Sequence, residues 1–457
     1  MRTILAALFS TALVAAVVGC TRGNTVGSKS GPAWTRWGIT RPTTERGAEA
    51  KLADAYRLLY ALKFDSARTT YQELVRSLPT SAEAHHGLSM AYRYTGMRDT
   101  ALTEARTALE LDPDATGVLL NYADLVLPIR TGDIPGKSAT ERFAESERSN
   151  LKAAASTHPL SAHAHTTLWA SYMAQGRWSD ARLQAAELGR LNYYQQPLID
   201  FGHNLLAGLA LNAILFTNGD NDTYPPSVLQ QMTEPFRPDV TIANLSLLNI
   251  PAVVKMMKDS FGVPVSLTDA EIAALAPKTG PDGKSILLPS QQVVANIIAN
   301  AAKIDRAVYF AVTVSKEMTA PYADWLVNEG LVNRVAELTP VVTVDFDRIT
   351  ENLDKNYRLD WPKQLPAWPQ NMSPITRMIA PLAVNYASIY AQLASRYDSL
   401  GQKKQEDAAW LEAVTWMMRG ERKDLASTVV DEWLEHSPDN AAAKKLKAEP
   451  GRAAKAN

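Results

Sequence analysis

Residues 218–223 bring two carboxylates and two amides together in one short loop. The loop follows an apolar run at residues 213–217 and precedes a helical pattern that starts at Pro226, so we place it between a strand and a helix. Carboxylate and amide oxygens are the ligands that Ca²⁺ and Mg²⁺ prefer in proteins. The candidate metal ligands are Asp220 and Asp222, and the candidate ligand-binding residues are Asn218, Asp220, Asn221, Asp222 and Thr223.

Known loop patterns fit these residues only in part. Counted from Asn218 as a calcium loop, the sequence has Thr223 where glycine is needed and Leu229 where glutamate is needed. The Asp-x-Asp pair resembles the acidic triplet with which sugar-nucleotide transferases hold a metal and a diphosphate, but such pairs are common. The nucleophile loop of haloacid-dehalogenase-like phosphatases has a Thr or Val two residues after its second Asp, whereas Thr223 follows Asp222 directly.

A structural interpretation of the loop needs no ligand. Asn and Asp side chains bond the backbone of tight turns and cap helices, and Gly219 would supply a positive φ. The sequence leaves open whether the loop closes a turn, holds a metal or ligand, or catalyses a reaction. No Gly-x-Ser-x-Gly, glycine-rich phosphate-binding or His-Glu-x-x-His motif occurs, which favours a protein that is not an enzyme and holds no cofactor.

Three apolar runs predict the strands that position the loop, at residues 213–217, 240–245 and 307–313. Helical patterns alternate with them at residues 226–232, 252–259 and 291–304. This alternation predicts a small α/β domain with a mainly parallel sheet, at residues 197–350, with edge strands at 331–338 and 341–346. In such sheets ligands bind at the carboxyl ends of the strands, where residues 218–223 would lie.

Residues 48–196 show the period of a helical repeat. Ala67 and Ala101 are 34 residues apart, and 34 residues is the tetratricopeptide period. At an offset of 80 residues, Ser-Ala-Glu-Ala-His at 81–85 matches Ser-Ala-His-Ala-His at 161–165. One helical hairpin cannot bury its apolar stripe alone, so hairpins stack and share a core. The chain therefore resembles the tetratricopeptide repeat family here, with four helical hairpins expected.

The repeats supply a second candidate site. First-helix residues outside the packing stripe line the concave side of such a stack, which predicts a mixed polar and aromatic groove for an extended peptide or a partner helix. A solvated face is the alternative. The predicted groove residues of the second repeat are Glu83, His86, Arg93 and Tyr94.

Helical patterns resume after a Pro- and Trp-rich linker, which we place at residues 351–375. Gly401 separates two of them, and we expect repeat-like helical hairpins over residues 376–449. The predicted fold class is therefore α plus α/β, with tetratricopeptide-type hairpins flanking a small α/β domain.

The first residues have the parts of an export signal. Arg2 precedes an apolar run at residues 4–18, which is followed by Cys20, the only cysteine of the chain. We expect a lipoprotein signal peptide at residues 1–19 and lipidation of Cys20, which would hold the protein at a membrane. An ordinary signal peptide or an uncleaved anchor helix is the alternative. By analogy, we expect the bacterial cell envelope, at the outer membrane and facing the periplasm.

Residues 20–47 are rich in Gly, Ser, Thr, Arg and Pro and predict a flexible tether. Trp34 and Trp37 are unusual in such a segment, and they either dock on the body of the protein or lie at the lipid interface. Over the whole chain, 47 Lys and Arg residues face 48 Asp and Glu residues. This balance and the lack of a basic block before the C-terminal tail argue against a nucleic acid partner.

Three segments of the α/β region carry a family resemblance: residues 213–225, Arg-Pro-Asp-Val at 237–240, and Asn-Leu-Ser-Leu-Leu-Asn at 244–249. They resemble the soluble C-terminal part of bacterial multi-spanning membrane proteins that are similar to protein O-mannosyltransferases, over roughly residues 198–340. The resemblance implies an α/β unit combined with helical repeats, and work on envelope glycans or surface proteins. This chain lacks the membrane helices that would carry a lipid-linked sugar transferase, so the transferase activity is not implied.

The sequence favours a lipid-anchored scaffold of the cell envelope that binds a protein or peptide partner through its helical repeats. The alternative is a metal-dependent enzyme or binding module that acts on envelope glycan or sugar phosphate through residues 218–223.

Overall fold

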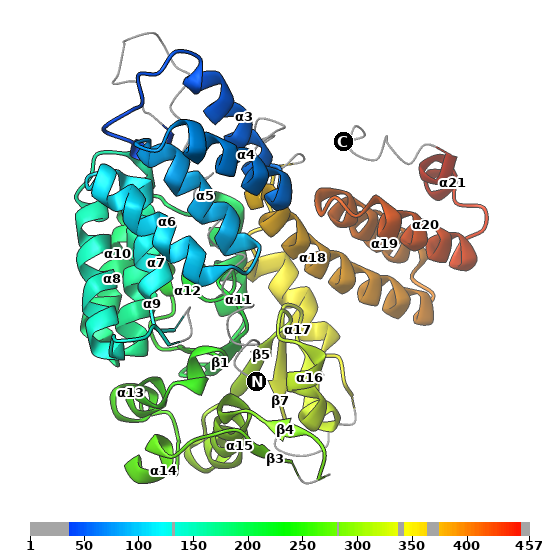
Figure 1. Cartoon of the computed structure of the whole chain (residues 1–457). Helices are drawn as coiled ribbons and strands as arrows, with labels where there is room; N and C mark the ends of the chain where they lie inside the picture. Colours follow the sequence, from blue (N-terminus) through cyan, green and yellow to red (C-terminus); the bar gives the residue numbers. More distant parts are fainter. Residues whose placement is uncertain (1–35, 130–132, 281–282, 337–341, 363–373, 449–457) are drawn as a thin grey trace. The chain divides into compact units, whose positions relative to one another are not determined.

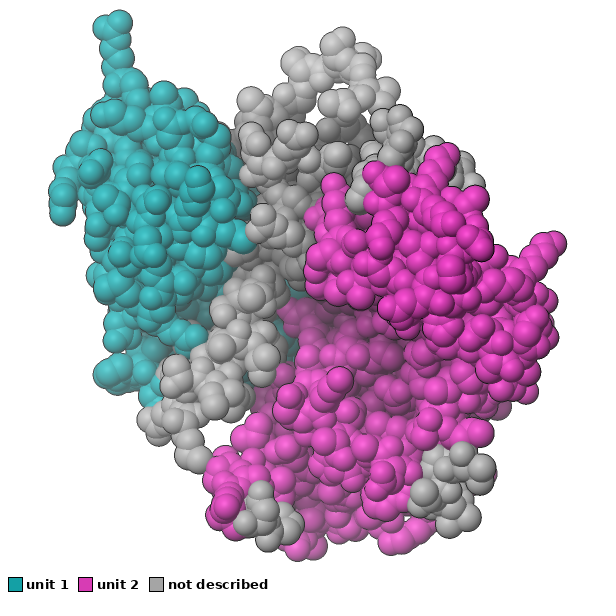
Figure 2. Space-filling view, turned by 90° about the vertical axis from the view of Figure 1, so that its right-hand side faces the viewer, with its two compact units in different colours: residues 1–193, 368–375 teal, residues 194–367, 376–457 magenta. Residues whose placement is uncertain are grey.

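The computed structural model describes residues 36–129, 133–280, 283–336, 342–362 and 374–448. The chain divides into two compact units, which Figure 2 colours separately. Unit 1 comprises residues 1–193 and 368–375, and unit 2 comprises residues 194–367 and 376–457. The expected signal peptide, Cys20 and Trp34 lie outside the described residues.

Unit 1 is built from helical hairpins that pack in chain order (Figure 1). The first helices of the hairpins are α3 (Ala48–Tyr60), α5 (Ala82–Tyr94), α7 (Thr116–Val126) and α9 (His163–Ala174). Their second helices are α4 (Phe64–Ser77), α6 (Arg98–Leu111), α8 (Ala139–Ala154) and α10 (Trp178–Arg190). Two short 3₁₀ helices, η1 (Arg36–Gly38) and η2 (Pro159–Ala162), precede α3 and α9. The predicted tetratricopeptide-type hairpins are confirmed.

Small residues let the helices of each hairpin approach closely. Ala67, Ala101 and Ala181, which occupy equivalent positions of three second helices, are each fully buried. Gly96 and Gly176 follow the first helices with φ of 82° and 70°, a left-handed conformation that ends a helix without the steric penalty of a side chain. The repeat period of the sequence thus reflects the close helix contacts and the turns between them.

Unit 2 holds a five-stranded sheet in the order β2-β1-β5-β7-β6. The strands are β1 (Ile214–Thr217), β2 (Thr241–Asn244), β5 (Val308–Ala311), β6 (Leu326–Asn328) and β7 (Val332–Val335). β2, β1 and β5 are parallel, whereas β7 pairs antiparallel with β5 and β6 antiparallel with β7. β1 and β5 are buried along their whole length, so the core of the sheet lies at its parallel strands.

Helices connect and flank the strands of unit 2 (Figure 1). They are α11 (Gln196–Ala207), α12 (Tyr224–Leu229), η3 (Leu247–Asn249), α13 (Pro251–Phe261), α14 (Asp269–Ala273), α15 (Pro289–Ala301), η4 (Ala302–Ile304), α16 (Lys316–Thr319), η5 (Ala320–Trp325), α17 (Phe346–Glu351) and the π-helical turn η6 (Asn352–Asn356). A small separate hairpin consists of β3 (Lys278–Thr279) and β4 (Ile286–Leu287).

The three predicted parallel strands are present, but the prediction for the edge of the sheet was partly wrong. The strand expected at residues 341–346 is reduced to a single bridge between Asn328 and Val344. Asp345 ends it because its side chain accepts a hydrogen bond from the Arg348 N–H and caps α17. β6 was not expected because its three residues carry too little alternation to stand out.

Helices resume after the linker, as α18 (Pro374–Ser399), α19 (Lys403–Arg419), α20 (Lys423–His436) and α21 (Ala441–Ala448). α18 begins earlier than the pattern from residue 386 indicated and contains Pro381. Tyr386 on α18 stacks on Trp416 of α19, with ring centroids 4.4 Å apart. In the part of the chain that the structure describes, no helix is both long and apolar enough to cross a membrane.

Candidate functional site

The acidic loop lies at the carboxyl ends of the parallel strands, as the sequence predicts. It leaves β1 at Thr217 and enters α12 at Tyr224. Asn244 ends the neighbouring strand β2, and Thr313 lies two residues past the end of β5. Side chains from three adjacent strands therefore meet around residues 218–223.

Asp222 lies at the centre of this cluster of side chains. It is buried, with 2% of its surface exposed. Its Oδ2 accepts from the Asn218 N–H and its Oδ1 from the Gly219 N–H, both at 2.8 Å. The Thr313 hydroxyl also donates to Oδ2. A carboxylate offers about four acceptor positions, so backbone and hydroxyl donors of the protein take up most of what Asp222 could offer a metal.

Thr223 continues the same network toward β1 and β2. Its hydroxyl lies 2.7 Å from the Thr217 hydroxyl and accepts from Asn244 Nδ2 at 2.9 Å. Thr217, Thr223 and Asn244 are all buried. We call Asp222, Thr217, Thr223, Asn244 and Thr313 the strand-end lock, because together they tie the ends of β1, β2 and β5 to the loop.

Burial raises the pKa of the Asp222 carboxyl, and the hydrogen bonds from Asn218, Thr313 and Gly219 oppose that rise. A buried carboxyl with a raised pKa is one mark of a catalytic acid. Here the donors around it are those of a capped turn, which favours the structural interpretation of Asp222.

The remaining loop residues lie nearer the surface. Asn218 is exposed, and Gly219, Asp220 and Asn221 are half-buried. The Asp220 carbonyl accepts from the N–H groups of Thr223 and Tyr224 at 3.3 and 2.9 Å. Gly219 does not adopt the positive φ expected of it; the Asp222 carboxylate, which accepts its N–H, closes the turn instead.

The Arg-Pro-Asp segment of the family motif is a second structural device. The Arg237 guanidinium donates to the carbonyls of Leu206, in the last turn of α11, and of Leu209 and Ala210 after it, at 2.7 to 2.9 Å. It also forms a two-pronged ion pair with Asp239, which lowers the pKa of Asp239 to about 2. The motif thus fixes the chain before β1, away from the acidic loop.

Among the described residues, three acidic or imidazole side chains lie close enough to hold a metal ion only at Asp398, Glu406 and His436, with ligand atoms within 4.8 Å of one another. The Lys403 ammonium donates to both carboxylate oxygens of the buried Glu406, at 3.0 and 2.9 Å. Because Lys403 already supplies a cation there, this group is an ion-pair network that joins the end of α18, the start of α19 and the end of α20.

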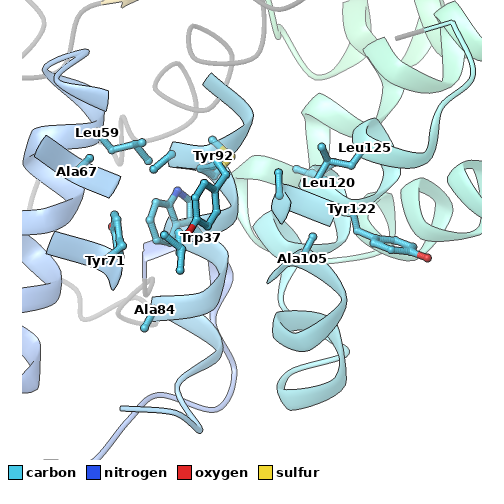
Figure 3. Packing of buried hydrophobic residues seen from close by; sticks show 14 of the residues in the cluster. Trp37, Leu59, Ala67, Tyr71, Ala84, Tyr92, Ala105, Leu120, Tyr122 and Leu125 are labelled. Atoms are coloured by element: carbon cyan, nitrogen blue, oxygen red, sulfur yellow. The ribbon is translucent and has the colours of Figure 1, made fainter. Parts of the chain in front are cut away.

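A segment of the protein itself covers part of the surface where the sequence predicts a groove. Residues 36–41, which belong to the expected tether, pack on the first helices α3, α5 and α7; we call them the docked segment. This part of the segment is not a free linker because Trp37 and Ile39 are buried, with 2% and 3% of their surface exposed. Figure 3 shows Trp37 among the buried side chains of the repeats.

An aromatic pocket surrounds Trp37. Its indole ring lies 5.0 Å from the Tyr56 ring and 4.4 Å from the His86 ring, measured between centroids. The indole N–H donates to the Tyr60 hydroxyl at 3.2 Å. Burial, with a contribution from Arg93, lowers the pKa of His86 to about 3, so this histidine is neutral at pH 7.

A buried carboxylate, that of Glu83, holds Arg36, the residue before Trp37. The Arg36 guanidinium donates to Glu83 at 2.6 Å and to both oxygens of Glu49 at 2.7 and 2.9 Å. Burial opposes the charge of Arg36, but the bonds to Glu49 and Glu83 raise its pKa above the ordinary value. Burial also raises the pKa of Glu83, and Arg36 limits that rise.

A second buried carboxylate holds the other end of the docked segment. Asp112, which is fully buried between α6 and α7, accepts from the Thr40 hydroxyl and N–H at 2.6 Å and from the Arg41 N–H at 2.9 Å. Ile39 packs into a small cluster formed by Ala82, Ala108, Ala115 and Val118.

Two glycines, one in α7 and one in the docked segment, make the close contact between these two elements possible. A Cβ atom at Gly117 of α7 would lie 2.6 Å from the Trp37 Cβ, and one at Gly38 would lie 3.0 Å from the Thr116 hydroxyl. Gly38 also has a φ of 64°. Neither position accepts a larger residue while the segment is docked.

The fit of the docked segment is imperfect. Trp37 adopts a left-handed conformation with φ 55°, which costs a residue with a side chain about 1–2 kcal/mol. The Tyr71 hydroxyl and His86 Nδ1 are buried beside it without a hydrogen-bond partner in the described part of the chain, at a cost of about 1–3 kcal/mol each.

The other two predicted groove residues connect neighbouring repeats. The Arg93 guanidinium donates to Asn121 at 3.2 Å and to Asp124 at 3.1 Å, and Thr167 donates to Asp124 at 3.3 Å. Tyr94 stacks on Phe64 with a centroid distance of 4.7 Å. Of the predicted groove residues, the docked segment therefore covers Glu83 and His86, while Arg93 and Tyr94 join α5 to its neighbours.

Sequence reasoning missed Arg36, Thr40 and Asp112 as parts of this site. One signal was available, because a tryptophan in a Gly- and Ser-rich tether indicates docking. The pairing of Thr40 with Asp112 left no signal, since the two are 72 residues apart.

Comparison with known proteins finds a family similarity within unit 2. The family model described as TMEM260-associated domain 2 matches residues 198–279. The matched residues run from α11 to β3 and include the acidic loop, most of the strand-end lock and the Arg237–Asp239 pair. No curated protein matches the chain.

Comparison with solved structures finds distant similarities, among them a TPR domain. Pseudomonas aeruginosa PilF is 16% identical over 50% of this chain and 87% of its own, with a TM-score of 0.31. The type IV pilus biogenesis factor PilW is 19% identical over 50% of this chain and 90% of its own, with a TM-score of 0.31. The TPR domain of P58(IPK) is 11% identical over 89% of this chain and 98% of its own, with a TM-score of 0.21.

Proposed function

We propose that this protein is a lipid-anchored scaffold of the bacterial cell envelope that binds a partner protein through the first helices of its repeats. One observation carries the proposal: the surface formed by α3, α5 and α7 already holds a peptide segment, residues 36–41, by buried side chains and buried charges. A surface with these contacts is suited to the capture of peptides.

The anchor is part of the proposal. Residues 1–19 have the pattern of a lipoprotein signal peptide, and Cys20 stands at the position of the lipidated residue. Lipid on Cys20 would keep the repeats near the membrane, where partners share the same surface. In cells fed a labelled fatty acid, the full chain should take up label and a Cys20→Ala variant should not; label in both would contradict the anchor.

The proposal also assigns the α/β unit a place in the cell envelope. This unit resembles the soluble tail of membrane proteins similar to protein O-mannosyltransferases, so we place the scaffold beside the machinery that modifies envelope glycans or surface proteins. Its own contribution would be docking, because the described contacts of Asp222 are those of a structural cap. Metal or ligand binding by Asn218, Asp220, Asn221, Asp222 and Thr223 stays a prediction. Thermal unfolding with added Ca²⁺ or Mg²⁺ would test the metal.

The proposal is tested by a photo-crosslinking amino acid at two positions of the full chain in living cells. Tyr94 lies on the first helix α5, whereas Leu183 is 62% exposed on the second helix α10. We expect one envelope protein to be captured from position 94 and not from position 183. Equal capture at both positions, or capture at neither, would refute the scaffold function.

A further inference from the structure

The docked segment occupies the surface through which the proposed partner would bind. Trp37 fills the aromatic pocket of Tyr56, Tyr60 and His86, and Arg36 uses the buried carboxylate of Glu83. A second peptide cannot reach these groups while residues 36–41 remain in place. The surface is therefore closed by the protein itself until the segment leaves.

The chemistry of the surface defines what fits it. Two buried carboxylates, Glu83 and Asp112, stand at the two ends of the docked segment and accept from a guanidinium at one end and from a hydroxyl and two N–H groups at the other. The indole of Trp37 lies among Tyr56, Tyr60 and His86 on one side, and on the other side the missing side chain of Gly117 makes room for the Trp37 Cβ and backbone. An acidic peptide is excluded because it would face both carboxylates.

The present occupant leaves part of the available binding unused. Trp37 is held with a positive φ, and the Tyr71 hydroxyl and His86 Nδ1 lack hydrogen-bond partners among the described residues. A ligand that inserts its indole from a relaxed backbone and reaches one of these two atoms would form contacts that the docked segment does not form.

We propose that residues 36–41 are a displaceable internal ligand, and that the partner inserts a segment of the same chemistry: a basic residue, then Trp, then Gly, and a Thr or Ser two residues later. This inference rests on the proposed function and specifies its partner. Residues 42–47 join the docked segment to α3, so the segment is present at an effective concentration of roughly millimolar. Binding of the partner and release of the segment are therefore coupled.

The test uses the full chain and a fluorescein-labelled peptide with the sequence of residues 35–43. In an emptied variant, Trp37→Ala with Thr40→Ala, we expect the labelled peptide to bind at least tenfold tighter than to the unchanged chain. When Glu83→Gln is added to the emptied variant, the labelled peptide should bind more weakly. A peptide with Gln in place of Arg36 should bind with the same affinity with and without Glu83→Gln. A control peptide with Ala in place of Trp37 should not bind.

A second measurement does not depend on how well the emptied variant folds. In the unchanged chain, labelled with ¹⁵N so that its fragments differ in mass from the peptide, excess unlabelled peptide should accelerate amide exchange at Thr40 and Arg41. If a folded emptied variant binds the Trp and Ala peptides equally, or exchange stays unchanged under peptide excess, the proposal is overturned. Dimers formed by exchange of residues 36–41 between two copies would also overturn it, because the occupant would then be a second copy.

The two proposals can fail separately. Capture of a partner at position 94 that excess peptide does not reduce would refute the displaceable ligand and leave the scaffold standing. Peptide binding without capture of any envelope protein would refute the scaffold and leave the specificity of the surface established.

Discussion

The acidic loop of unit 2 and the first-helix surface of unit 1 both bury carboxylates, but they obtain their hydrogen-bond donors from different places. Asp222 is capped by its own loop, through Asn218 and Gly219. Asp112 and Glu83 receive donors from a segment 47 to 72 residues away that precedes the first repeat helix. The donors of Asp222 come from its own loop and from Thr313 beyond β5, so they belong to the α/β fold. The donors of Glu83 and Asp112 come from a segment outside the repeats, and this difference is the basis of our proposal that the repeat surface binds peptides.

The largest expected effect is on the docked segment. Trp37→Ala should lower the free energy of unfolding of unit 1 by about 3–5 kcal/mol, because a buried aromatic side chain is lost and a cavity remains. Urea unfolding followed by circular dichroism measures the loss. Trp325, which is 41% exposed in unit 2, is the control: Trp325→Ala should cost less than about 1 kcal/mol. Equal losses would show that Trp37 is not docked in solution.

A somewhat smaller loss is expected in the strand-end lock. Asp222→Asn places an NH₂ group among N–H and hydroxyl donors, and should destabilise unit 2 by about 2–4 kcal/mol. Asp220→Asn, at a half-buried carboxylate, should cost less than about 1 kcal/mol. Thermal unfolding of both variants decides the comparison, and a larger loss for Asp220 would reverse the assignment of the two carboxylates.

The same thermal assay tests the metal hypothesis. A metal bound by the loop would raise the Tm when millimolar Ca²⁺ or Mg²⁺ is added, because it binds the folded state, and Asp220→Asn would remove the rise without touching the cap. We expect no rise with either ion. A rise that disappears in Asp220→Asn would revive the metal-dependent alternative.

His86 makes unit 1 sensitive to acid. Its pKa is about 3 in the fold and ordinarily 6.5, so the unfolded chain binds the proton first and stability falls as pH drops below 6.5. Between pH 7 and pH 5 the loss should be about 2 kcal/mol. Glu83, whose pKa is raised by burial, acts in the opposite direction above pH 4.5. Comparing urea unfolding with that of His86→Gln isolates the histidine, and parallel pH profiles would contradict its buried, neutral state.

A close contact between Gly117 and Trp37 allows a comparison of one change in two backgrounds. Gly117→Ala should destabilise unit 1 by about 1–3 kcal/mol because its Cβ would collide with Trp37. Trp37→Ala alone keeps the Cβ and backbone atoms of residue 37 that the new side chain would meet. In the emptied variant, Trp37→Ala with Thr40→Ala, the segment should leave α7, and Gly117→Ala should then be neutral, or stabilising by up to about 1 kcal/mol, since Ala favours helices. A mutant cycle by urea unfolding measures this difference. An identical cost in both backgrounds would place Trp37 away from α7.

Much of the fold follows from periodicity. The 34-residue spacing of Ala67 and Ala101 reflects real helix contacts, because only a small side chain fits there and both alanines are fully buried. The parallel strands were equally visible, since β1 and β5 are buried on both faces and read as continuous apolar runs. The antiparallel edge was harder to predict because β6 is three residues long.

The candidate sites were predictable only where the signal is local. Residues 218–223 stand out in the sequence as a polar cluster. Their residue types do not show that the Asp222 side chain is buried, because its contacts include Thr313, which follows β5. Glu83 and His86 were identified from their place on the repeat, but what covers them was not. The docked segment pairs with residues far along the chain, as Thr40 does with Asp112 between the second and third hairpins, and no short-range pattern encodes that pairing.

Amide hydrogen exchange on the full chain tests most directly whether the repeat surface holds residues 36–41. The N–H groups of Thr40 and Arg41 donate to the buried Asp112. We predict that they exchange at least tenfold more slowly than in a free peptide of residues 35–43, and that Asp112→Asn removes this protection. Exchange at the rate of the free peptide would contradict the docked segment and, with it, the peptide-binding surface on which the proposed function rests.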